Sequence, residues 1–228
     1  MIDFSILFED GEALVIDKPA GLPLDRPRAG GPCLEDHLDG LRFGFQREPH
    51  PVHRLDQDTS GCLLLARNPK ALKRFSAAFE AREVEKVYLG IVACEVEGES
   101  GTIDLALSKI SSAEKGWRMI PAKKGKPSVT HWKVVARKPG MTLVEFRPET
   151  GRTHQIRIHA LAGLGAALVG DPIYGDGKIA WRTMLHASEL KVTREGKEPI
   201  DAYSPMPLDF AAFAFDVPVV GEVPATED

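Results

Sequence analysis

Cysteine is scarce in this sequence: Cys33, Cys62 and Cys94 lie about thirty residues apart and form no C-x-x-C pair. An odd number of widely spaced thiols argues against a disulfide framework and against a thiolate metal site. Long hydrophobic runs are also missing, since the longest stretch of low polarity, ALAGLGAALVG, is too short to cross a bilayer. With no signal-peptide pattern at its start, we expect a cytoplasmic protein without a membrane segment.

An overall excess of positive charge is absent too, because the formal net charge is -4 at pH 7. This balance argues against a protein that binds nucleic acid through its whole surface. The charge is uneven, however: residues 109–137 hold eight Lys and Arg residues against Glu114 alone, a net charge of +7. The segment is either a solvated flexible loop or a local basic surface that engages phosphates.

Several patterns typical of catalytic sites do not occur. The chain has no G-x-x-x-x-G-K-[ST] loop, no H-E-x-x-H pair and no G-x-S-x-G elbow around Ser60, which we expect to hydrogen-bond within its own loop. His154 and His159 are five residues apart and would not share one helical face, so we expect no metal site. The segment GDPIYGDG is interpreted as a structured turn rather than a dinucleotide site.

Strand patterns outnumber helical ones along the chain. Strands are predicted in ILFEDGEALVIDKPAGLPL, where two flank an Asp-Gly turn, and in GCLLLARN, EKVYLGIVACEV, SVTHWKVVARK and MTLVEFRPETG. Helices are predicted in PKALKRFSAAFEAR and in THQIRIHALAG, the latter with Thr153 as N-cap and Gly163 as terminator. Because turns join most elements, we expect a single α+β domain over residues 1–228, with a mixed, mostly antiparallel central sheet, flanking helices and a loose tail at about 217–228.

Two polar clusters stand out, HRLDQDTSG at residues 53–61 and GRTHQIRIH at residues 151–159. If they meet in space, a carboxylate would lie beside a guanidinium, which keeps an Asp ionised and fixes its orientation. An ionised and oriented carboxylate can act as a nucleophile or a base. Periodicity alone does not show that they meet, and the first cluster is also compatible with a solvated loop before a buried strand.

At these residues the sequence resembles the RluA-type pseudouridine synthase family, whose signature loop is H-R-L-D-x-x-T-S-G. Further similar segments follow in the family's order, namely DKPAGLPL, EKVYLGIV, GRTHQIRIHALAGLGAALVGDPIYG and RTMLHASEL. The resemblance therefore covers nearly the whole chain. It implies a pseudouridine synthase fold with a catalytic cleft and an enzyme that isomerises uridine in RNA without cofactor or metal.

The resemblance also assigns catalytic roles. Asp56 would be the essential carboxylate, Arg157 the guanidinium that pairs with it, and Tyr88 the tyrosine that stacks on the base and helps to remove the C5 proton. Residue type alone would favour a half-buried strand tyrosine at position 88. Whether Asp56 attacks the sugar or the base, or assists removal of a ribose proton, is left open.

The expected partner is a tRNA or a ribosomal RNA, bound by a monomer. The residues expected to contact RNA are His53, Arg54, Lys123, Lys124, Lys126, Arg152 and His154. The chain enters the catalytic pattern within its first ten residues, without the extra RNA-binding domain of many relatives, so RNA selection falls to the catalytic domain. Alternative hypotheses are an inactive RNA-binding or ribosome-assembly factor of the same fold, and a metal-dependent hydrolase.

Overall fold

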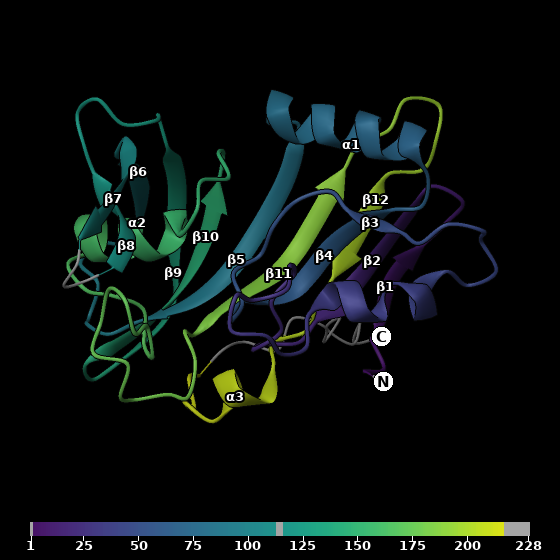
Figure 1. Cartoon of the computed structure of the whole chain (residues 1–228). Helices are drawn as coiled ribbons and strands as arrows, with labels where there is room; N and C mark the ends of the chain where they lie inside the picture. Colours follow the sequence, from purple (N-terminus) through teal and green to yellow (C-terminus); the bar gives the residue numbers. More distant parts are fainter. Residues whose placement is uncertain (1, 113–115, 217–228) are drawn as a thin grey trace, which may run out of the picture.

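The computed structural model of the protein describes residues 2–112 and 116–216, and its main element is a ten-stranded mixed sheet (Figure 1). The strand order is β1-β2-β4-β11-β5-β10-β9-β6, with β12 paired to β11 and β3 paired to β4. The strands are β1 (Ile6–Glu9), β2 (Ala13–Lys18), β3 (His50–Pro51), β4 (Ser60–Ala66), β5 (Val84–Val92), β6 (Ser100–Asp104), β9 (Val129–Lys138), β10 (Met141–Pro148), β11 (Leu185–Val192) and β12 (Ile200–Tyr203). Within the described strands, β4 and β11 form the one parallel pair, and all others pair antiparallel.

Buried side chains line both faces of the central strands, as the continuous apolar run of β4 requires. Leu63 and Leu65 belong to the apolar core on one face, and Leu64 belongs to a second core on the opposite face. Helix α1 (Pro69–Ala81) contributes Phe75 to the second core. The first core is covered by η1 (Leu34–His37), η2 (Asp39–Leu41) and α2 (Gln155–Leu164). This face also buries Leu55, and it carries the loop that leads to β4.

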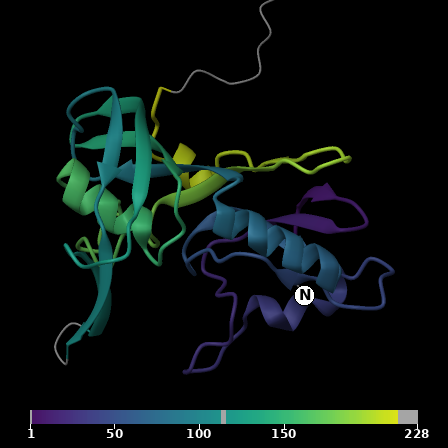
Figure 2. The ribbon, with the colours of Figure 1, turned by 90° about the horizontal axis from the view of Figure 1, so that it is seen from above.

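The two ends of the sheet carry different segments of the chain (Figure 2). Strands β6, β9 and β10 lie at one end with α2 and a separate hairpin of β7 (Leu107–Ser112) and β8 (Gly116–Pro121). Strands β1 and β2 lie at the other end, and β4, β11 and β5 connect the two. The short helix α3 (Leu208–Ala211) packs Phe210 against Ile91 and Met184. The central strands therefore support both polar clusters.

The fold class and the element types predicted from the sequence are confirmed, but two helix boundaries are wrong. Helix α2 has His154, not Thr153, at its N-cap, and it ends at Gly165 rather than Gly163. Gly165 has φ 87°, the left-handed conformation that commonly ends a helix. Gly163 lies inside the helix, and a Cβ there would stand 2.7 Å from the side chain of Ile103, so glycine serves this close contact rather than the end of the helix.

Ser60 also differs from expectation, because its hydroxyl lies 2.9 Å from His186 Nδ1 on β11 instead of bonding within its own loop. All three cysteines are free. No helix of the described ranges is long and apolar enough to span a membrane. The predicted tail at 217–228, and Glu114 and Lys115 of the basic segment, lie outside the described residues.

Candidate active site

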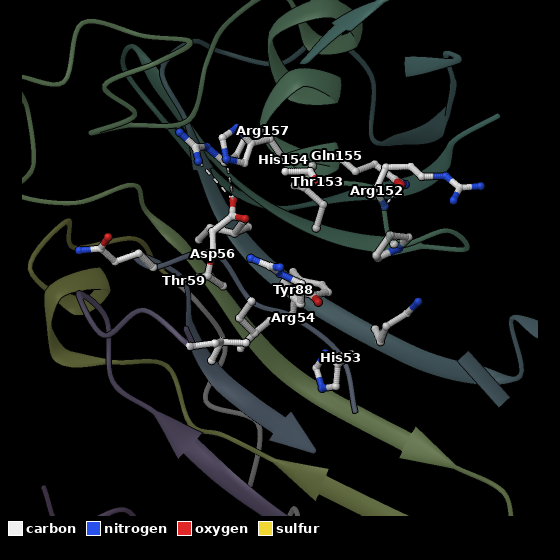
Figure 3. A pocket seen from close by; sticks show the side chains of 18 of the residues that line it. His53, Arg54, Asp56, Thr59, Tyr88, Arg152, Thr153, His154, Gln155 and Arg157 are labelled. Carbon is white, nitrogen blue, oxygen red and sulfur yellow. Dashed lines mark hydrogen bonds and ion pairs between the residues drawn. The ribbon is translucent and has the colours of Figure 1, made fainter. Parts of the chain in front are cut away.

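A cleft of about 880 Å³ lies at the junction of the two polar clusters (Figure 3). Its walls come from residues 52–59, from β5, and from residues 148–157 at the end of β10 and the start of α2. Asp56 and Arg157 both line it, so the two clusters, about a hundred residues apart in the sequence, meet in space. The cleft volume falls in the usual range for small-molecule sites, which is large enough for a nucleotide.

Two buried basic side chains, Lys18 and Arg182, hydrogen-bond to the backbone of the loop that contains Asp56. Lys18 is fully buried, and its Nζ donates to the carbonyl oxygens of Pro19, Leu22 and Gln57 at 2.8, 2.9 and 3.0 Å. Arg182 donates from Nη1 to the carbonyl oxygen of Asp58 at 3.0 Å. Both cations therefore fix carbonyls immediately after Asp56.

Lys18 and Arg182 differ in the acidic side chains that surround them. Burial lowers the pKa of Lys18 to about 7, although the charges of Asp58 and Asp56 oppose the shift. Arg182 also pairs with Asp209 at 2.6 Å. The Asp56 side chain itself remains 27% exposed toward the cleft.

Arg157 presents one edge of its guanidinium to Asp56 and the other to a second carboxylate. Its Nη1 donates to Asp56 Oδ2 at 3.2 Å, while its Nε and Nη2 donate to Asp171 at 2.7 Å each. Asp171 is fully buried and accepts the backbone N–H groups of Ile173 and Tyr174 through one oxygen. Burial by itself would raise the pKa of Asp171, yet the hydrogen bonds and charge of Arg157 lower it. The bidentate pair thus fixes the direction in which Arg157 meets Asp56.

His154 lies on the same side of Asp56 as Arg157 (Figure 3). Its Nε2 is 4.0 Å from Asp56 Oδ2, its Nδ1 is 3.1 Å from the hydroxyl of Tyr174, and its ring contacts that of Trp117 with centroids 4.8 Å apart. Burial lowers the pKa of His154, although Asp56 opposes this effect. With φ 51°, His154 adopts a left-handed conformation that is uncommon outside glycine and is often found at functional sites.

Tyr88 lies on β5 at the opposite wall of the cleft from Arg157 (Figure 3). It is buried, and its strand pairs with β11 on one side and β10 on the other. Burial, and next the charge of Asp56, raise the pKa of Tyr88, so its phenol is protonated in the free protein. A neutral phenol ring at this position is suited to packing against a nucleobase, and its hydroxyl would have to release its own proton before it could accept another.

His53 and Arg54 occupy the wall next to Tyr88, but they differ in state. His53 stacks on Phe79 with centroids 4.7 Å apart, and its Nε2 accepts the backbone N–H of Leu64 at 3.1 Å. Burial, and second the ammonium of Lys86, lower the pKa of His53 to about 3. His53 is therefore a neutral ring at pH 7 and not a cation for phosphates. Arg54 is 82% exposed, with Asp25 Oδ2 3.4 Å away, and is accessible to a polyanion.

The remaining residues expected to bind RNA are spread over a larger surface. Arg152 lines the cleft, and its guanidinium points away from Asp56 (Figure 3). Lys123, Lys124 and Lys126 are exposed in the turn after β8 and do not line the cleft. The predicted basic segment thus covers the β7–β8 hairpin and β9, where Lys109 lies over the ring of Trp117 at 4.8 Å.

The sequence did not single out Asp171, Tyr174, Lys18, Arg182 or Lys86. Their segments were recognised, for example GDPIYG as a turn, but the pairing of a turn Asp with a helix Arg depends on the tertiary packing. Both nitrogens of His159 face protein oxygens, Thr130 Oγ1 at 2.9 Å and the carbonyl of Leu105 at 3.2 Å. Among the described residues no three His, Cys, Asp or Glu side chains gather as metal ligands.

A mixed sheet whose central cleft holds a carboxylate, a fixed guanidinium and a buried tyrosine matches known proteins in sequence and in structure. A family model described as RNA pseudouridylate synthase matches residues 12–162. An uncharacterised RNA pseudouridine synthase of Zymomonas mobilis is 53% identical over 213 residues, which span 92% of this chain and 97% of that protein. Ribosomal large subunit pseudouridine synthase D of Xanthomonas campestris is 36% identical, over 91% of this chain and 67% of the relative.

The solved structure of Human RNA Pseudouridylate Synthase Domain Containing 4 superimposes with a TM-score of 0.74, at 26% identity and over 90% of both chains. The chain belongs to the RNA pseudouridylate synthase family. Its class is therefore that of enzymes that isomerise uridine in RNA to pseudouridine.

Proposed function

We propose that this protein converts particular uridines of ribosomal or transfer RNA to pseudouridine, with Asp56 as the catalytic carboxylate. The observation that carries the proposal is the 3.2 Å contact between Asp56 and Arg157 in a cleft large enough for an unstacked nucleotide. Asp171 supports it from behind, because it fixes the guanidinium and leaves one edge free for Asp56.

The reaction needs no second substrate. The bond from N1 of uracil to C1′ of ribose breaks, the base turns while it is held, and C5 forms a new bond to C1′. The proton lost from C5 is balanced by the proton that N1 gains, so the product is an isomer. Asp56 acts on the sugar or the base, or it assists in removing a ribose proton. Tyr88 packs against the turning base, and the proton on C5 leaves on its side of the cleft.

A uridine inside folded RNA must leave its stack before Asp56 can reach it. Extrusion costs a few kcal/mol, which phosphate contacts and stacking can offset. The cleft offers aromatic rings for stacking at Tyr88 and Trp117 and an exposed cation at Arg54. These groups favour binding of a flipped nucleotide over binding of a paired base.

Ribosomal RNA is the favoured substrate, because the relative from Xanthomonas campestris is named for the large ribosomal subunit. A tRNA stem-loop is the other candidate. Mapping pseudouridines in total RNA from a strain that lacks the gene identifies the target as the position where the modification disappears. A cytoplasmic location, a single domain and a monomeric state remain predictions.

Tritium release from RNA labelled at C5 of uridine tests the catalytic assignment. Wild type should release tritium, Asp56→Asn should release none above background, and Tyr88→Phe should bind RNA while turnover falls. Equal rates for wild type and Asp56→Asn would end the assignment. A wild type that binds RNA and releases no tritium would favour the inactive RNA-binding factor, and loss of activity with a chelator would favour a metal-dependent enzyme.

A further inference from the structure

Lys86 lies on β5 two residues before Tyr88 and lines the same cleft. Alternate residues of a strand project from one face, about 7 Å apart along the chain. Only 9% of the Lys86 surface is exposed, which is unusual for a lysine. Lys86 therefore places a positive charge in the cleft, two residues along the strand from Tyr88, the ring proposed to pack against the base.

The ammonium of Lys86 has no hydrogen bond and no ion pair with any residue that the structure describes. Its Nζ lies 5.7 Å from the centroid of the Phe79 ring, and its charge acts on His53, whose pKa it lowers. Burial lowers the pKa of Lys86, and no carboxylate offsets this effect. Of the four acids in the cleft wall, Asp56 pairs with Arg157 and Asp25 with Arg54. The charge of Asp58 acts on Lys18, and Glu80 is exposed at the end of α1. An ammonium on a mostly buried side chain, with no protein partner, is only partly solvated, and an arriving anion would recover part of the lost solvation free energy.

The surroundings of Lys86 favour a nucleic-acid strand over a carboxylate-bearing protein segment or a neutral ligand. Arg54 and Arg82 are exposed and line the same cleft, and the stacked rings of His53 and Phe79 line it as well. Arg82 ends α1 in a left-handed conformation, with φ 62°. Three cations and two rings in one cleft match the phosphates and bases of a single strand.

We propose that Lys86, flanked by Arg54 and Arg82, forms a phosphodiester-binding subsite for the nucleotide next to the extruded uridine. The inference rests on the proposed function, because it places an RNA backbone in the cleft. A lysine suits this position as a compact charge with three donors that can bind a phosphate from the cleft wall. Phosphate contact at this depth would hold the strand while Tyr88 packs against the base.

The experiment measures binding of a fluorescent octauridylate to wild type, Lys86→Met, Lys86→Arg and Lys73→Met, between 50 and 200 mM salt, roughly the range over which phosphate contacts show their salt dependence. Methionine keeps the apolar stem and removes the charge, and Lys73 is an exposed lysine of α1 outside the cleft. Lys86→Met should bind roughly tenfold more weakly, and its salt slope should fall by about 0.7, the value of one phosphate contact on a single strand. Lys86→Arg should retain the wild-type slope, and Lys73→Met should match wild type.

Urea unfolding of the same variants separates binding from folding. Because Lys86→Met removes an unpartnered buried charge, its unfolding midpoint should equal or exceed that of wild type. A midpoint clearly below wild type would assign Lys86 a structural role and overturn the proposal. An unchanged affinity and salt slope in Lys86→Met, or a wild type that does not bind the oligomer, would overturn it as well.

Tritium release distinguishes the failure of this inference from the failure of the proposed function. If wild type modifies RNA and Lys86→Met binds as wild type does, the subsite is wrong and the enzyme assignment stands. If wild type binds the octauridylate through Lys86 but modifies no RNA, the subsite stands and the catalytic assignment is wrong.

Discussion

Asp171 determines how Arg157 meets the carboxylate of Asp56, because two of the guanidinium's three hydrogen bonds to carboxylates go to Asp171. Asp171→Asn should lower the free energy of unfolding by about 3–5 kcal/mol, since it leaves a buried charge poorly compensated. Tritium release should fall at least tenfold because Arg157 loses its fixed direction. Urea unfolding and initial rates measure both effects. Asp176→Asn, an exposed change in the same loop, should alter neither, and a stable, fully active Asp171→Asn variant would contradict this account.

His53 predicts a specific pH dependence of stability. Its folded-state pKa of about 3 lies below the ordinary value of 6.5, so the unfolded chain takes up the proton first as the pH falls. The neutral ring therefore contributes stability that is present above about pH 6.5 and is lost as the pH falls toward 3. His53→Gln should flatten this loss by up to about 1.4 kcal/mol per pH unit.

Urea unfolding at several pH values across this window measures the slope. His50→Gln, an exposed histidine on the neighbouring strand β3, is the matched control and should keep the wild-type slope. Equal slopes in wild type and His53→Gln would mean that the imidazole takes up its proton at the same pH in the folded and the unfolded protein.

Individual residues differ in how far the sequence could predict them. Asp56 and Arg157 lie in recognisable motifs. If the two segments met, a carboxylate next to a guanidinium was expected on physical grounds. Asp171 and Lys86 could not be found this way, because their significance lies in burial and in which partner is present or absent. The charge state of His53 could not be predicted for the same reason, because it follows from tertiary contacts: the N–H of Leu64 and the ring of Phe79 favour a neutral imidazole.

At the scale of elements, the parallel contact between β4 and β11 depends on Gly61. Gly61 has φ 106°, and a Cβ at this position would stand 2.1 Å from the carbonyl oxygen of Ala187. Gly61→Ala should therefore destabilise the fold by more than about 3 kcal/mol, since a strained backbone alone costs about 1–3 kcal/mol. Thermal or urea unfolding measures the loss.

Gly140 separates the cost of backbone strain from the cost of the steric clash. It also has a positive φ, 73°, but a Cβ there would meet nothing within 4 Å. Gly140→Ala should cost only about 1 kcal/mol, the backbone part of the effect. Similar losses in the two variants would show that β4 and β11 can move apart at no additional cost.

Most elements could be predicted because their local patterns agree with their environment. The apolar run of β4 and the 3.6-residue spacing of α1 both persist in the structure. The caps of α2 were wrong because they are decided by tertiary contacts: Gly163 is needed for the approach of Ile103, and His154 is drawn to Tyr174 and Trp117. The pairing of β4 with β11 cannot be seen in the local sequence, because contacts such as that between Ser60 and His186 join residues 126 positions apart.

For the whole molecule, the sequence predicts a monomer. Light scattering during size-exclusion chromatography should give a mass near 24.9 kDa, the mass of one chain, across a range of protein concentrations. The physical reason is the absence of a long apolar stripe or heptad pattern in the sequence. A concentration-independent mass of twice this value would contradict the prediction. The comparison is best made at moderate salt, because the acidic total charge and the basic hairpin favour nonspecific association at low salt.

The buried cation Arg182 and strand β11 have a consequence for biosynthesis. Ribosomes deliver the chain from its amino end, and the loop that bears Asp56 emerges long before the residues that hold Asp58 and Ser60 in place. A nascent chain that ends before Arg182 and β11 therefore contains the whole HRLDQDTSG motif but lacks Arg182 and His186, which hold the loop of Asp56 in place. We expect catalytic competence to arise late in translation, once β11 has been made and the loop of Asp56 is held in place.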